Sequence, residues 1–163
     1  MQAVYSGIYP ELVLWAKGLI DFPAIGVGNA YQYFLTGGTA NPPATRLALS
    51  PLRRRANLPQ LETWLSKTLS TIGPTHPAYK DFEVIQKQLT LLSDSETARA
   101  QVAKFYRSWL DLLAVTPKAG RSLALFQDLS SAYALGKSLT VLTDEGTARR
   151  PESVAEPLML SCL

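Results

Sequence analysis

Three consecutive arginines, Arg53, Arg54 and Arg55, form the group of side chains whose type and spacing most clearly indicate chemistry. The whole chain has 16 Lys and Arg against 13 Asp and Glu, so its net charge is only +3. Residues 51–80, by contrast, carry five basic residues and one acidic residue. Guanidinium groups bind phosphate oxygens in a bidentate way, and adjacent ones can neutralise successive phosphates. The triplet therefore predicts contact with a phosphate backbone; the alternatives are a solvated charge run and ion pairs with acidic groups.

Residue types that catalysis and metal binding need are scarce. The chain has one histidine, His76, and one cysteine, Cys162, which argues against a disulfide framework, a cysteine zinc site and a histidine-rich metal site. His76 lies between Thr75 and Pro77, where a turn or a helix cap is a commoner role than general-base catalysis. We therefore expect no catalytic residues, no metal and no cofactor. A small enzyme of unknown class is the third interpretation.

Apolar residues at helical spacing organise the chain between residues 57 and 137. The stripe between residues 96 and 115 carries Phe105 and Trp109 beside aliphatic residues, so both side chains are expected in the core. Short loops join the predicted helices, which is typical of an up-and-down bundle. The stripes predict helices at 58–72, 78–92, 96–115 and about 120–136.

The segments on either side of this region are less regular. Residues 12–35 are the most apolar, and Trp15 is expected as a core anchor at helical spacing with Leu12 and Leu19. Charged residues and glycines interrupt this segment, so it does not meet the requirement for a membrane span. Its secondary structure stays open, residues 36–43 are predicted as a loop, and the polar segment from residue 143 is predicted as a flexible tail.

These patterns together predict an all-α, four-helix-bundle-like fold with an irregular N-terminal segment and a flexible C-terminal tail. The expected domain spans 1–142, with an apolar segment and loop at 1–50 and the helical bundle at 57–137; the tail covers 143–163. An unpaired thiol and the lack of an N-terminal signal pattern favour a cytoplasmic location.

Two longer stretches resemble the C-terminal region of the coat proteins of rod-shaped plant viruses, the tobamoviruses and tobraviruses. The stretches are 99–113 (RAQVAKFYRSWLDLL) and 121–127 (RSLALFQ). Trp15 followed by Gly28, Asn29 and Gln32 is similar to a tryptophan and a Gly-Asn-x-x-Gln pattern in the same family. The sequence departs from the family at 100–101, where Ala and Gln replace an acidic pair, and at Gln127, where glutamate is typical.

The resemblance implies a four-helix bundle that stacks into a helical tube around single-stranded RNA. It implies that Arg99 contacts phosphate, that Arg107 forms an ion pair inside the bundle and that Phe126 is a core anchor. Residues 125–129 also resemble, more loosely, the small helical subunits of RNA-guided surveillance complexes. We therefore expect a self-assembling structural subunit that binds single-stranded RNA, in the cytoplasm or in a virion. The alternative is a helical adaptor that binds other proteins only.

Overall fold

Helices dominate the computed structural model, which describes residues 9–21, 23, 46–91, 95–139, 142–144, 147–149 and 151–163. The prediction of an all-α, bundle-like fold is confirmed. The predicted loop at 36–43 and the Gly28–Gln32 pattern lie outside the described residues. The α-helices are α1 (Tyr9–Ala16), α2 (Leu58–Ile72), α3 (Tyr79–Gln88), α4 (Ser95–Val115), α5 (Arg121–Ser138) and α6 (Ala155–Ser161).

Two short antiparallel hairpins and three single turns of 3-10 helix complete the described elements. In the first hairpin, β1 (Arg46–Leu49) pairs with β2 (Arg54–Asn57), and η2 (Ser50–Leu52) lies in the connection. In the second, β3 (Leu142–Asp144) pairs with β4 (Thr147–Arg149). The other two turns are η4 (Lys118–Gly120), before α5, and η5 (Pro151–Ser153), before α6. The sequence did not predict the first hairpin, because both faces of β1 are buried and its residues lack the alternation of a half-exposed strand.

Helix boundaries follow local signals where those signals are strong. The predicted helix at 58–72 has the same bounds in the structure, and Gly73 ends it with a positive φ of 69° that glycine adopts without strain. Pro77 does not open the next helix: α3 begins two residues later, because residues 77 and 78 form a turn. Helix α4 ends at Val115, just before Pro117, as predicted.

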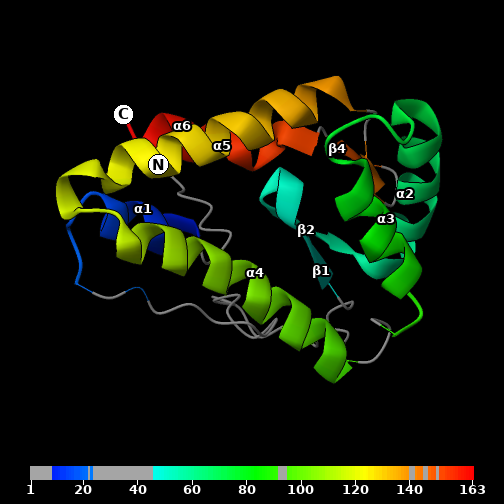
Figure 1. The fold of residues 1–163 in the computed structure, drawn as a ribbon, viewed down its shortest axis with the longest axis horizontal. Helices are drawn as coiled ribbons and strands as arrows, with labels where there is room; N and C mark the ends of the chain where they lie inside the picture. Colours follow the sequence, from blue (N-terminus) through cyan, green and yellow to red (C-terminus); the bar gives the residue numbers. More distant parts are fainter. Residues whose placement is uncertain are drawn as a thin grey trace.

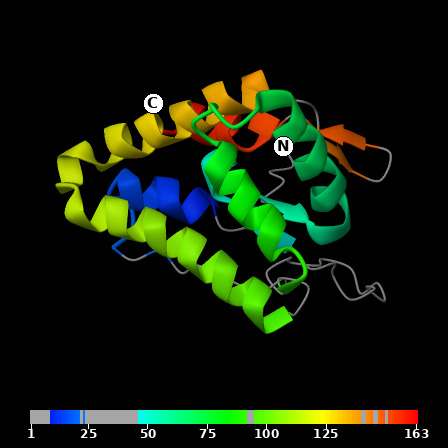
Figure 2. The same ribbon diagram turned by 45° about the vertical axis from the view of Figure 1, so that its right-hand side comes forward.

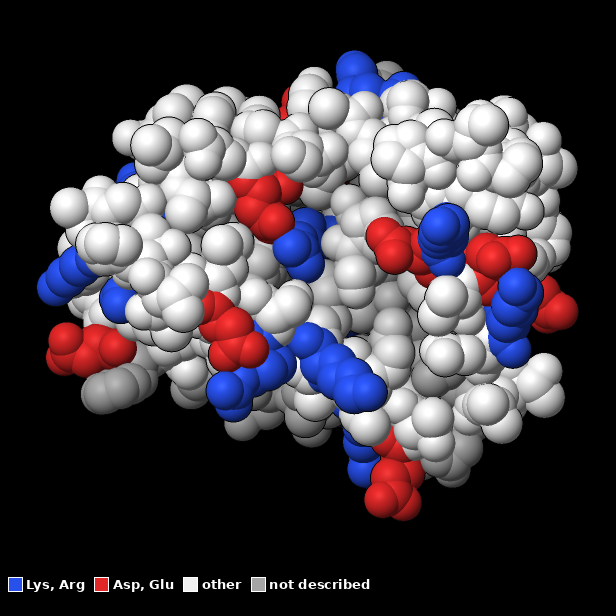
Figure 3. All heavy atoms as spheres, in the orientation of Figure 1, with Lys and Arg blue, Asp and Glu red and all other residues white. Residues whose placement is uncertain are grey.

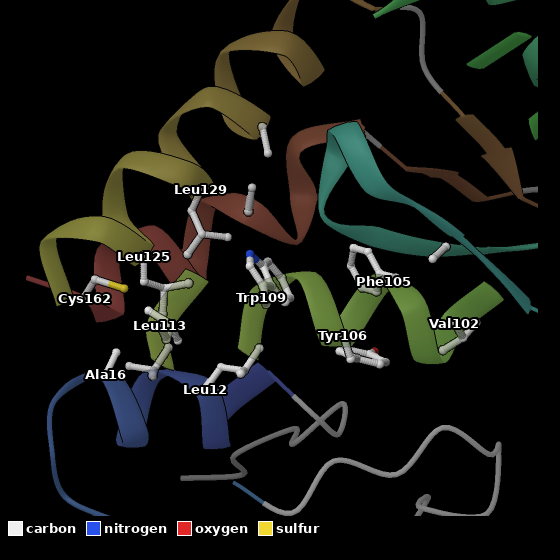
Figure 4. Close-up of a cluster of buried hydrophobic side chains, with 14 residues drawn as sticks. Leu12, Ala16, Val102, Phe105, Tyr106, Trp109, Leu113, Leu125, Leu129 and Cys162 are labelled. Carbon is white, nitrogen blue, oxygen red and sulfur yellow. The ribbon is translucent and has the colours of Figure 1, made fainter. Parts of the chain in front are cut away.

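Buried apolar side chains form two clusters. The first, the α4 cluster, lies between α1, α4, α5 and α6; in Figure 1, α4 and α5 diverge from their common turn at the left, with α1 beside that turn and α6 along α5. Figure 4 labels members from α1 (Leu12, Ala16), from α4 (Val102, Phe105, Tyr106, Trp109, Leu113) and from α5 (Leu125, Leu129), together with Cys162, which directly follows α6. These four helices are the bundle of the molecule.

The second cluster, the α2 cluster, lies between the first hairpin, α2 and α3. Its buried aromatic side chains, Trp64 and Phe82, meet edge to face with ring centroids 5.5 Å apart. Strand β1 joins the two clusters, because alternate side chains point to opposite faces: Leu47 and Leu49 belong to the α2 cluster and Ala48 to the α4 cluster. Figure 2 shows α2, α3 and this hairpin together at one end of α4 and α5.

The C-terminal segment differs from the predicted flexible tail. Residues 151–163 form η5 and α6, which pack along α5, and Ala155 and Cys162 are buried in the α4 cluster. The polar composition of 143–157 suggested solvent exposure, but the apolar side of α6, with Leu158 and Met159, covers the bundle. The prediction of a tail is therefore wrong for residues 151–163.

Candidate nucleic-acid interface

The structure separates the three arginines of the triplet. Arg54 and Arg55 are neighbours in β2, so their side chains leave opposite faces of the hairpin. Arg54 lies on the face of Leu47 and Leu49, and Arg55 lies opposite Ala48 on the other. Arg53 precedes the strand and has a left-handed backbone, with φ 49°. A continuous row of three guanidinium groups is therefore not formed.

Arg53 is engaged within the chain. Its Nε and Nη2 donate to the two carboxylate oxygens of Asp128, at 2.8 and 2.7 Å, and these side chains are only 18% and 20% exposed. Asp128 also accepts a hydrogen bond from the indole Nε1 of Trp109, and the Arg53 guanidinium lies over the Trp109 ring, 5.1 Å from its centroid. This pair argues against the predicted phosphate contact by Arg53, because a carboxylate of α5 already fills its bidentate donor edge.

Arg54 is also unavailable to a phosphate backbone. The residue is 4% exposed, and its Nη1 lies 3.4 Å from the carbonyl oxygen of Pro151 in η5. A buried guanidinium group cannot meet an RNA strand unless the fold opens. This burial argues against the predicted phosphate contact by Arg54. Arg55 is half-buried, which leaves part of its surface open to solvent.

Arg99 and Arg107 lie on the solvent side of α4, and both are exposed. Arg107 does form an ion pair, because its Nε donates to Asp111 Oδ1 at 2.7 Å one turn along the helix. The pair lies on the surface, however, with the side chains 76% and 57% exposed, and not inside the bundle as the resemblance implied. Among the described residues, the half-buried Arg–Asp pair is Arg53 with Asp128.

The solvent side of α4 is the longest basic surface that a single element presents among the described residues. No acidic residue lies between Glu96 and Asp111, and the charged residues between them, Arg99, Lys104 and Arg107, are all exposed. Within the described part of the chain, no acid pairs with Arg99 or Lys104. In Figure 3, Lys and Arg side chains gather along the course of α4, with acidic side chains among them.

The inner side of α4 holds this surface in place. Gln101, six residues after the start of α4, donates through Nε2 to the carbonyl oxygen of Ala48 at 2.7 Å and accepts from the Ala48 N–H at 2.9 Å. The amide therefore pairs with the backbone of β1 as a neighbouring strand would. Phe105 and Trp109 anchor the same helix in the core, whereas Trp15 and Phe126 are partly buried and pack against the α4 cluster. Sequence reasoning missed Gln101 and Asp128 because their partners are 53 and 75 residues away.

His76 and Cys162, the other residues that could take part in catalysis or metal binding, lie in a turn and in the packed core. The Nδ1 of His76 accepts a hydrogen bond from the backbone N–H of Ala78 at 3.2 Å, in the turn before α3. Burial raises the pKa of the Cys162 thiol, and the charge of Lys17 acts in the opposite direction. No three His, Cys, Asp or Glu residues gather as a metal site within the described ranges. None of the described helices is long and apolar enough to cross a membrane.

Comparisons of the chain with protein families, with curated proteins and with solved structures find no match. The coat-protein resemblance stays a prediction.

Proposed function

We propose that this protein is a non-enzymatic structural subunit that assembles with copies of itself and binds the backbone of single-stranded RNA along the solvent side of α4. In this proposal Arg99, Lys104 and Arg107 contact phosphates, and Arg55 contributes from β2, opposite Ala48, whose backbone pairs with Gln101 of α4. The location is the cytoplasm, or a virion if the coat-protein resemblance holds. Arg53 and Arg54 have no part in RNA binding and instead hold the hairpin to α5 and η5.

The observation that carries the proposal is the run of exposed cations on α4 without an intervening acid. Ala100 and Ala103 are the exposed residues between them, so no long side chain keeps a strand away from the helix surface. The three cations span about 12 Å of helix at 1.5 Å per residue. Such a short row neutralises a few phosphates per subunit, so strong binding requires several subunits along one strand.

The salt dependence of binding to a short oligouridylate tests this proposal. Each phosphate contact contributes about 0.7 to the slope of log affinity against log salt concentration for a single strand. Arg99→Ala and Lys104→Ala should each lower the slope by about that amount. Lys67→Ala removes an exposed cation from α2 and is the matched control, which should leave the slope unchanged. Binding that is indifferent to salt, or that weakens equally with Lys67→Ala, would contradict the proposal.

A helical adaptor that binds proteins only is the second candidate. The observation that favours it is the internal use of Arg53 and Arg54, which removes two of the four predicted phosphate ligands. The ratio of absorbance at 260 and 280 nm after purification separates the two candidates. A subunit that holds RNA purifies with nucleic acid at low salt and loses it at high salt, whereas an adaptor shows the ratio of pure protein throughout.

A further inference from the structure

Large aliphatic side chains are exposed at one end of the bundle. Leu19, Val115, Leu123 and Leu160 are between 59% and 82% exposed. They come from four segments: the residues after α1, the end of α4, the first turn of α5 and the end of α6. An apolar surface contributed by several elements is typical of an interaction site rather than of scattered surface residues.

Contacts between neighbouring residues bring these four segments together. The Arg121 guanidinium lies over the Trp15 ring, 4.7 Å from its centroid, and Arg121 Nε donates to the carbonyl oxygen of Thr116 at 3.2 Å, which joins α5 to α1 and to the end of α4. The hydroxyl of Ser122 donates to the carbonyl oxygen of Cys162 at 2.9 Å, which joins the start of α5 to the end of α6. In Figures 1 and 2, the turn between α4 and α5 and the end of α1 lie at the same end of the molecule.

Charges of both signs border this apolar end. Lys17 and Asp21 are exposed on either side of Leu19, and the stem of Lys118 lies directly over Gly18. A polyanion or an anionic membrane would favour a border of one sign. A second copy of the same chain favours both signs, because a two-fold contact places a residue of one copy opposite a different residue of the other. Lys17 of one copy can then face Asp21 of the other.

We propose that the apolar end formed by Leu19, Val115, Leu123 and Leu160 is the contact between two copies of this chain, with Lys17 and Asp21 pairing across it. This inference deepens the proposed assembly function and rests on its self-association, but it does not depend on RNA. The apolar end includes the C-terminal turn of α4, whereas Arg99 and Lys104 lie in the first half of that helix. A subunit can therefore contact a neighbour and RNA at the same time.

Sedimentation velocity of the RNA-free protein over a concentration series tests the contact. The wild-type chain should self-associate, and Val115→Asp or Leu123→Asp should weaken association about tenfold or more, because each buries an unpaired carboxylate. Val84→Asp is the matched control: Val84 is half-exposed on α3, away from the apolar end, so its association constant should match that of the wild type. Circular dichroism checks that each variant keeps its helices.

Charge reversal tests the choice of partner. Lys17→Glu should weaken self-association, and the double variant Lys17→Glu with Asp21→Lys should restore it, because the pair is re-formed with its signs exchanged. A wild-type chain that stays monomeric at every concentration would overturn the inference. So would equal weakening by Val84→Asp, or binding to phosphatidylserine vesicles by a chain that does not self-associate.

The two proposals fail separately. An oligouridylate too short for two subunits should bind Val115→Asp as it binds the wild type, with the same salt slope. Loss of salt-dependent RNA binding with intact self-association would refute the proposed RNA contact and leave the apolar contact standing. The reverse result would refute only the contact between copies.

Discussion

At the scale of single residues, the Arg53–Asp128 pair joins segments that are far apart in the sequence. The Asp128 carboxylate accepts from Arg53 and Trp109 together, so the connection of the first hairpin, α4 and α5 meet at one group. Arg53 holds a left-handed backbone that costs an L-residue energy, and the bidentate pair offsets this cost. A half-buried pair with these bonds is worth more than an ion pair in open solvent.

A double-mutant cycle measures this difference. Arg53→Ala with Asp128→Asn should give a coupling free energy of about 1–2 kcal/mol in urea unfolding, since the amide oxygen can still accept from Trp109 and only the charged pair is lost. The same cycle on Arg107 and Asp111 is the control. That pair has the same 2.7 Å separation in open solvent, so its coupling should be about 0.3–0.5 kcal/mol. Equal couplings would mean that burial does not strengthen the Arg53 pair.

At the scale of elements, the packing of η5 against α5 depends on Gly136. A Cβ at this position would lie 2.7 Å from the backbone nitrogen of Glu152 and 2.9 Å from its Cα. Backbone atoms cannot move aside as the end of a side chain does, so α5 needs a residue without a side chain at the point where η5 crosses it. The glycine lies inside a helix for this reason, despite its weak helix propensity.

Gly136→Ala should therefore destabilise the protein although alanine is the better helix former. We expect a loss of about 1–3 kcal/mol, since overpacking outweighs the gain in propensity of roughly 1 kcal/mol. Gly120→Ala is the control, because a Cβ there would meet only the Thr116 methyl group at 3.4 Å. Thermal unfolding followed by circular dichroism compares the two variants, and a stabilised Gly136→Ala protein would show that η5 can move away.

At the scale of the whole molecule, the two clusters form one packing unit. Residues of β1 contribute to both, and so do the two long helices: Ala98 of α4 belongs to the α2 cluster, as does Leu139 after α5, while most of α4 and α5 packs in the α4 cluster. The chain has 163 residues, only slightly more than the roughly 150 below which most single domains unfold in an all-or-none transition. Both clusters are therefore expected to unfold together.

Leu61→Ala, a truncation in the α2 cluster, tests this coupling. In a Trp64→Phe background the remaining tryptophans, Trp15 and Trp109, belong to or pack against the α4 cluster. Leu61→Ala should lower the free energy of unfolding by about 2–4 kcal/mol. The urea midpoint from the fluorescence of these tryptophans should therefore fall by the same amount as the midpoint from circular dichroism. Separate midpoints for the two probes would show that the clusters unfold independently.

Local sequence determined the helical class and the course of most helices. Apolar residues at helical spacing, together with Gly73 and Pro117, determine where α2 ends and α4 stops, because backbone and side-chain constraints there act over a few residues. Only the tertiary structure decided which arginines of the triplet are exposed. A carboxylate 75 residues away pairs with Arg53, and the alternation of side chains along β2 buries Arg54. It also decided that residues 151–163 pack on α5: a short amphipathic helix is unstable alone and is held by the surface that it covers.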